Sequence, residues 1–209
     1  MIRELIILSG KGGTGKTTVT ASFAALAGKK VTADCDVDAA DLHLVLKPEV
    51  KHTEEYIGGK KAFINPRICS TCGKCVELCR FDAIDKFFVT DVLSCEGCGV
   101  CAAFCPENAI EMKPHVSGYR FISKTEHGPL IHARLGIAEG NSGKLVSVLR
   151  KLSKEKAEAE RCGLIITDGS PGIGCPVIAS VTGASFVLLI TEPTVAGIHD
   201  MKRIHGLTK

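Results

Sequence analysis

The chain has 209 residues, of which 45% are hydrophobic and 23% charged, and its formal net charge is +3. This is the composition of an ordinary soluble globular protein, and the length fits one sizeable domain together with a small one. The longest apolar run of the C-terminal half, Phe186 to Ile190, is far too short to span a membrane. Only four consecutive apolar residues precede the first glycine-rich segment, which argues against a signal peptide. We therefore expect no membrane segment and a cytoplasmic, reducing location.

The first predicted element is a buried strand, Glu4 to Ser9, which runs directly into the segment GKGGTGKTT. This segment fits the phosphate-loop pattern GxxxxGK(S/T), and a helix is predicted to follow from Thr17 to about Ala27. The glycines let backbone N–H groups turn toward phosphates, Lys16 reaches the terminal ones, and the Thr17 hydroxyl can ligate Mg²⁺. A chance glycine-rich loop is the alternative. The predicted nucleotide contacts are Gly10, Lys11, Gly12, Gly13, Thr14, Gly15, Lys16, Thr17 and Thr18.

An acidic stretch, DCDVDAAD, follows a second short predicted strand at Lys30 to Ala33. Acidic residues at the carboxyl end of a parallel strand face the nucleotide crevice of such folds. The alternative is an acidic cap and first turn of a helix, and we assign that structural role to Asp38 and Asp41. Asp36 is the residue of this stretch that we expect to be functional.

Eight of the eleven cysteines form two copies of the pattern CxxCxxCxxxC, 26 residues apart. This spacing is that of two-cluster bacterial ferredoxins, in which the fourth cysteine of each copy ligates the other cluster. Zinc prefers two separated CxxC pairs, and disulfides belong to secreted chains, so both alternatives fit less well. Arg80 stands where the pattern of the second copy has Pro106. The predicted ligands are Cys69, Cys72, Cys75 and Cys105 for one 4Fe-4S cluster and Cys95, Cys98, Cys101 and Cys79 for the other.

The segments flanking the cysteines predict an inserted domain from about Ala62 to Lys113. Residues 48–61 are polar and without periodicity, which indicates a linker, whereas residues 116–135 alternate enough to indicate strands that return to the main sheet. Short strands are expected at residues 63–64 and 87–89. His127 and His132 are interpreted as ordinary histidines, because the cysteine ligand set is complete without them. Two clusters at −2 each would bring the net charge to about −1, so nucleic-acid binding is not expected.

The C-terminal half predicts a helix from Asn141 to about Glu160, a buried strand at Leu164 to Asp168, another strand at 185–191 and a helix from 192 to 203. A carboxylate at a strand end has the form of a Walker B element, so Asp168 is predicted to help hold Mg²⁺.

In the sequence KGGTGKTT, Lys11 stands at a position where most phosphate loops accept any residue. This sequence resembles the phosphate loop of the ATPase group that contains MinD, ParA, Mrp-type cluster carriers and the nitrogenase iron protein. It is most similar to MinD-like ATPases that carry an inserted ferredoxin domain. The resemblance covers residues 1 to about 45 and 130 to 205. It implies an α/β P-loop NTPase with a mostly parallel sheet and helices on both faces, interrupted by a small α+β ferredoxin-like domain.

The resemblance also implies ATP as ligand and an ATP-dependent homodimer in which Lys11 reaches the partner's phosphates. Asp36 stands at the family's position for the carboxylate that orients the attacking water, so Lys11, Lys16 and Asp36 are the expected catalytic residues. Residues 169–174 resemble the second nucleotide switch. The expected domains are residues 1–61 with 114–209, and residues 62–113. The family continues with a further strand and a base-reading loop, so the chain is expected to lack C-terminal elements.

Cys35, Cys162 and Cys175 lie outside the repeat and are expected to be structural thiols. Cys175 also matches the offset of a cluster cysteine in the nitrogenase iron protein, but the segment that would supply its companion, 138–145, has no cysteine. Three uses remain open: ATP-coupled electron transfer to an unidentified redox partner, cluster assembly on an apo-protein partner, and a positioning ATPase with a redox sensor.

Overall fold

The computed structural model describes residues 1–137, 139–140 and 142–208, and these form two compact units. The sheet unit comprises the described residues of 1–56, 119–135 and 142–208. The cysteine-rich unit comprises residues 57–118 with the described residues of 136–140. Within the part of the chain that the structure describes, no helix is both long and apolar enough to cross a membrane.

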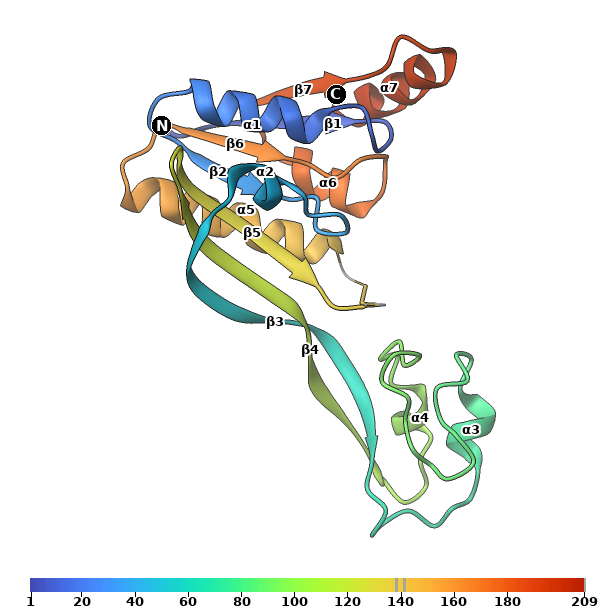
Figure 1. Ribbon diagram of the computed structural model, residues 1–209. Helices are drawn as coiled ribbons and strands as arrows, with labels where there is room; N and C mark the ends of the chain where they lie inside the picture. The colour runs from blue at the N-terminus through green and yellow to red at the C-terminus, as the bar shows by residue number, and fades with distance from the viewer. Residues whose placement is uncertain (138, 141, 209) are drawn as a thin grey trace. The chain divides into compact units, whose positions relative to one another are not determined.

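Seven strands form one sheet in the order β3-β4-β5-β2-β6-β1-β7 (Figure 1). Their bounds are β1 Arg3–Ser9, β2 Val31–Asp34, β3 Glu49–Ile64, β4 Ile110–Thr125, β5 Gly128–Leu135, β6 Leu164–Asp168 and β7 Phe186–Ile190. Strand β1 pairs in parallel with β6 and β7, and β2 pairs in parallel with β5 and β6. The carboxyl ends of β1, β2, β6 and β7 therefore meet at one edge, where ligands bind in open α/β sheets.

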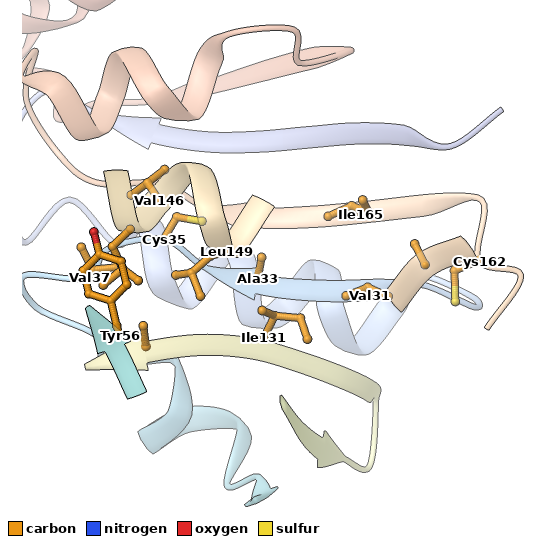
Figure 2. Packing of buried hydrophobic residues seen from close by; sticks show 13 residues of the cluster. Val31, Ala33, Cys35, Val37, Tyr56, Ile131, Val146, Leu149, Cys162 and Ile165 are labelled. Carbon is orange, nitrogen blue, oxygen red and sulfur yellow. The ribbon is translucent and has the colours of Figure 1, made fainter. Parts of the chain in front are cut away.

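Helices cover both faces of this sheet. The helices of the sheet unit are α1 Lys16–Leu26, α2 Leu42–Leu46, α5 Ser142–Ala159, α6 Cys175–Val181 and α7 Val195–Leu207, and the cysteine-rich unit contains α3 Lys74–Leu78 and α4 Val100–Ala103. Successive strand residues point to opposite faces. On β5, Leu130 packs with residues of α1 and α2, whereas its neighbour Ile131 packs with Leu149 of α5 (Figure 2). The prediction of an α/β fold with a mostly parallel sheet and helices on both faces is thus confirmed.

The predicted linker at residues 48–61 is wrong, because β3 runs from Glu49 to Ile64. Its buried positions begin only at Tyr56, and most of the exposed positions before it are polar. Strand β3 stands at the end of the sheet order, so one of its edges has no neighbouring strand in the sheet, and such edge strands carry many charged residues. The strand expected at 87–89 is also wrong, since Ile84 and Thr90 form only an isolated bridge.

The ends of the other predicted elements differ from the observed ones by up to six residues. The helix expected from Asn141 is observed as α5, and Asn141 itself lies outside the described residues. The returning strands expected at 116–135 are β4 and β5, of which β4 begins six residues earlier, at Ile110.

The cysteine-rich unit repeats its local structure as it repeats its sequence. Each short helix begins after a glycine with positive φ, Gly73 (80°) before α3 and Gly99 (76°) before α4, and these glycines are 26 residues apart. At Gly97, a Cβ would stand 2.1 Å from the carbonyl oxygen of Lys60, so no other residue fits there without a backbone shift. The two copies of the cysteine pattern therefore share one backbone conformation around each helix start.

Candidate functional site

The phosphate loop joins the carboxyl end of β1 to the N-terminus of α1. Ser9 Oγ donates to the carbonyl oxygen of Lys11 at 2.9 Å, and Gly13 and Gly15 have φ of 82° and 88°. At Gly10, a Cβ would come within 2.4 Å of Asp200 on α7, so the close passage of this helix requires glycine. The loop thus presents backbone N–H groups and the positive end of the α1 dipole at one place, as phosphate binding requires.

Lys16 lies at the centre of a buried group of charged residues. Its Nζ donates to Asp168 Oδ1 at 2.8 Å and to Asp36 Oδ2 at 3.1 Å. Thr17 Oγ1 donates to Asp168 Oδ2 at 2.8 Å, and Thr20 Oγ1 donates to Asp168 Oδ1 at 3.0 Å. The structure therefore brings together four residues that the sequence predicted as site residues. Thr20, one turn further along α1, was not predicted, since no motif marks it.

Negative charge exceeds positive charge in this group. Burial alone would lower the pKa of Lys16, but the carboxylates of Asp168 and Asp36 outweigh it and raise that pKa. Burial raises the pKa of Asp36, and burial reinforced by Asp168 raises the pKa of the neighbouring Asp34 to about 8. A divalent cation would offset this excess, and carboxylate and hydroxyl oxygens are ligands that Mg²⁺ accepts.

Two buried oxygens at the site, Asp36 Oδ1 and Thr14 Oγ1, have no hydrogen-bond partner among the residues that the structure describes. Buried polar atoms without partners are uncommon in native proteins. Both belong to residues for which the sequence predicted a role at the nucleotide. The residues present thus fit a bound phosphate group with its metal ion.

The acidic stretch has a different helix cap from the one predicted. Asp34 accepts the backbone N–H of Asp36 and that of Leu42, each at 3.1 Å, so its carboxylate holds both the functional stretch and the first residue of α2. Asp41 occupies the N-cap position but makes no side-chain cap hydrogen bond, and Asp38 lies in the preceding turn. The predicted capping role of Asp38 and Asp41 therefore falls to Asp34.

Lys11, the residue that distinguishes this phosphate loop, forms an ion pair with Glu192 at 2.7 Å, and both side chains are partly exposed. Glu192 follows β7, and its carbonyl oxygen accepts the backbone N–H of Thr194 at 2.8 Å. The predicted second switch lies nearby, because Gly172 donates its N–H to the carbonyl oxygen of Ser9.

Each group of four predicted cluster cysteines lines a cavity of its own. One cavity is lined by Cys69, Cys72, Cys75 and Cys105. The other is lined by Cys79, Cys95, Cys98 and Cys101. Each cavity therefore combines three cysteines of one copy with the fourth cysteine of the other, in the crossed arrangement that the spacing predicts.

Backbone N–H groups point at the crossing sulfurs in matching positions of the two copies. Ala83 donates to Cys79 Sγ at 3.4 Å and Ala109 donates to Cys105 Sγ at 3.3 Å. Burial, together with the nearby cysteines, raises the pKa of Cys101. Among the described residues, no three histidine, cysteine or acidic side chains come close enough to hold one metal ion.

The remaining cysteines differ in exposure. Cys35 and Cys162 are buried, as expected of structural thiols, whereas Cys175 is exposed at the start of α6. His132 is buried and forms a hydrogen bond with Ser123 at 2.9 Å, and burial lowers its pKa to about 4. His127 pairs with the adjacent Glu126.

Comparison with known proteins gives one family model, "CobQ/CobB/MinD/ParA nucleotide binding domain", which matches residues 5–207. An uncharacterised protein of Methanocaldococcus jannaschii is 39% identical over 207 residues, which cover 98% of this chain and 72% of that protein. The pyruvate synthase subunit PorD of Methanothermobacter marburgensis is 40% identical over 53 residues, which cover 25% of this chain and 65% of the subunit.

Among solved structures, the septum site-determining protein MinD of Pyrococcus horikoshii, in complex with Mg-ADP, is similar with a TM-score of 0.49 and 18% identity. The match covers 99% of this chain and 65% of that one. The chain thus spans less than two thirds of the length of this solved structure.

Proposed function

Because the chain belongs to the CobQ/CobB/MinD/ParA family of nucleotide-binding domains, we propose that it binds and hydrolyses ATP and couples this nucleotide switch to electron transfer through two 4Fe-4S clusters. The observation that carries the proposal is the pair of cysteine cavities, each of which combines cysteines of both sequence copies. The 53-residue similarity to a pyruvate synthase subunit supports a redox role for part of the chain.

At the nucleotide, the chain acts by positioning and by charge. The loop N–H groups and Lys16 bind the phosphates, while Thr17 and Asp168 hold Mg²⁺. Asp36, which has one oxygen on Lys16 and one oxygen without a partner, orients the attacking water. The burial of Lys16 strengthens its attraction to the phosphates, since charges interact more strongly away from water.

Lys11 has a role only if a second chain is present. In the structure it pairs with Glu192 rather than with Asp36 or Asp168, which pair with Lys16. In an ATP-dependent homodimer it would exchange this exposed partner for the phosphates bound by the partner subunit. An exposed ion pair stabilises little, so this exchange costs little.

In the cysteine-rich unit, the proposed ligands are the two groups of four cysteines that line the cavities. When bound, the clusters would supply one-electron transfer, with potentials set in part by N–H groups directed at the sulfurs. Ala83 and Ala109 provide such groups to the two crossing cysteines. We assign the inserted domain to residues 62–113 and the nucleotide-binding domain to the flanking segments.

The test is anaerobic reconstitution of the chain, followed by iron and sulfide counts and an EPR redox titration with and without MgATP. We expect about eight iron atoms per chain and a midpoint potential that moves with MgATP. Cys105→Ser is expected to remove the cluster assigned to Cys69, Cys72 and Cys75 and to leave the other. Cys162→Ser, a buried thiol far from the pattern in sequence, serves as the control. An iron count that Cys105→Ser leaves unchanged would contradict the assigned cluster ligands. A midpoint potential that is the same with and without MgATP would contradict the coupling between nucleotide and clusters.

A second function, cluster assembly on an apo-protein partner, is favoured by one observation, the exposure of Cys175. This function requires a labile cluster beyond the two in the cavities. The test is whether the reconstituted chain holds chelatable iron beyond eight atoms and whether Cys175→Ser loses that extra iron. Both results together would favour cluster assembly over electron transfer.

A further inference from the structure

A groove of about 440 Å³ opens in the cysteine-rich unit beside the first cysteine cavity. It is formed by the end of β3 and the residues that follow it, by the loop that joins the two cysteine copies, and by Cys69 and Thr71. Ile64, Cys69 and Phe88 line both the groove and the cavity of Cys69, Cys72, Cys75 and Cys105. A ligand in this groove would therefore lie next to the proposed first cluster.

The walls of the groove are apolar and aromatic. Phe63, Phe87 and Phe88 contribute three rings, and Phe63 and Phe87 remain 46% and 72% exposed. Val89 and Val92, also in the lining, are 61% and 43% exposed. Small-molecule sites are typically concave and apolar, hold about 300–1,000 Å³ and contain a few placed polar groups. Exposed aromatic side chains gathered at such a concavity mark a binding site rather than a folding core.

Two lysines lie against aromatic rings of the groove, and one of them, Lys113, also pairs with Glu111 at 3.7 Å. Lys113 Nζ lies 3.6 Å from the ring centroid of Phe63, and Lys86 Nζ lies 5.2 Å from that of Phe87. The nearby carboxylates of Asp85 and Asp91 are already engaged, because each accepts backbone N–H groups of its own loop. Thr90 Oγ1, in the lining, is buried without a hydrogen-bond partner in the structure.

We propose that this groove binds a planar aromatic molecule with an anionic substituent, whose ring packs on Phe63 and Phe87 and whose anion pairs with Lys86 and Lys113. Aromatic walls of this size match a fused-ring system, and two ammonium groups held on the ring faces favour an anion over a cation. The site is additional to the nucleotide and cluster sites of the proposed function. It is formed by side chains that neither of those sites uses, apart from Ile64, Cys69 and Phe88.

The test uses the full, iron-loaded chain under anaerobic conditions, with calorimetric titration of three probes. Flavin mononucleotide carries a fused ring and a phosphate, riboflavin carries the same ring without the phosphate, and methyl viologen is an aromatic cation. The variants are Phe87→Ala and Phe63→Ala for the ring contact and Lys113→Gln for the charge. Phe186→Ala, an aromatic residue of the sheet unit that is 56% exposed, is the control. Because Phe87 is mostly exposed, its truncation removes little internal packing.

We expect flavin mononucleotide to bind at one site per chain, more tightly than riboflavin, with no saturable binding of methyl viologen. Loss of one aromatic contact should weaken binding by about 3- to 10-fold in Phe87→Ala, and the control should bind as the parent does. Saturable binding that neither Phe63→Ala nor Phe87→Ala weakens, or no binding of either flavin, would overturn the proposal. Equal binding of riboflavin and flavin mononucleotide would overturn the role of the two lysines. These readouts are independent of MgATP and of the redox titration, so the proposed function can fail or hold separately.

Discussion

Replacement of Arg150 by alanine tests the buried ion pair that ties α5 to the first strand. Arg150 donates to both carboxylate oxygens of Glu4, at 2.9 Å from Nε and 2.6 Å from Nη2. Its Nη1 also donates to the carbonyl oxygens of Ala179 and Thr182 at the end of α6, at 2.8 and 2.7 Å. Both partners of the ion pair are buried, with Arg150 7% and Glu4 3% exposed.

The expected loss in free energy of unfolding follows from the buried carboxylate that the substitution leaves without its partner. In Arg150→Ala, the Glu4 carboxylate stays in the core, and among the described residues it keeps the hydrogen bond from Thr167 Oγ1 at 3.2 Å. Breaking a buried pair by removing one partner costs about 3–5 kcal/mol. For a chain of this size each kcal/mol lowers the melting temperature by about 2–4 °C, so a loss of about 6–20 °C is expected.

The assay is equilibrium unfolding in urea, followed by far-UV circular dichroism, because guanidinium chloride would screen the ion pair. Lys151→Ala is the matched control, since Lys151 is the next residue of the same helix and its contact with Glu155 is long, 3.8 Å, and exposed. Glu4→Gln in the Arg150→Ala background removes the buried charge and should restore part of the loss. A destabilisation below about 1 kcal/mol, or no recovery in the double variant, would refute the reasoning.

Three further predictions concern the nucleotide site. Lys16→Ala should abolish binding of MgATP in calorimetry while the iron count per chain stays unchanged; loss of both would argue against separate sites. Because the pKa of Asp34 is raised from 3.8 to about 8, the native state holds a proton that the unfolded state releases between those values. The free energy of unfolding of the nucleotide-free chain should therefore fall as pH rises from about 4 to 8, by at most about 1.4 kcal/mol per pH unit, and Asp34→Asn should flatten this slope in urea titrations. Glu192→Gln frees Lys11 and should strengthen dimerisation with a non-hydrolysable ATP analogue by about 2- to 5-fold in sedimentation experiments, an effect absent if the ion pair is incidental.

The features that the sequence predicts well are those fixed by residues close together in the chain. The strand before the phosphate loop, the helix after it and the strand that ends at Asp168 are each set by a local apolar run and a local boundary. The contact between Lys16 and Asp168 joins residues 152 positions apart, and it was predictable because both stand at the carboxyl edge of one parallel sheet.

The features that the sequence does not predict depend on pairing between distant residues without a motif. Glu4 lies in an apolar run, and nothing near it marks Arg150, 146 positions away, as its partner. The first half of β3 is mostly polar and its second half has two adjacent glycines, so its pairing in the sheet, rather than its own hydrophobic pattern, makes it a strand. Asp34 caps α2 from eight positions before it, which is beyond the reach of a local capping pattern.

The proposed coupling between nucleotide and clusters has a defined covalent route through the sheet unit. Asp34 binds the first backbone N–H of α2, and β3 begins at Glu49, three residues after that helix ends. His43 of α2 stacks on His132 of β5 at 6.0 Å between ring centroids, and His132 bonds Ser123 of β4. Strands β3 and β4 are also those that continue into the cysteine-rich unit. A nucleotide that moves the acidic stretch must therefore move or strain α2. This helix joins the stretch to β3 along the chain, and it contacts β5 both through the stacked rings and through Leu42 and Leu46, which pack with Leu130.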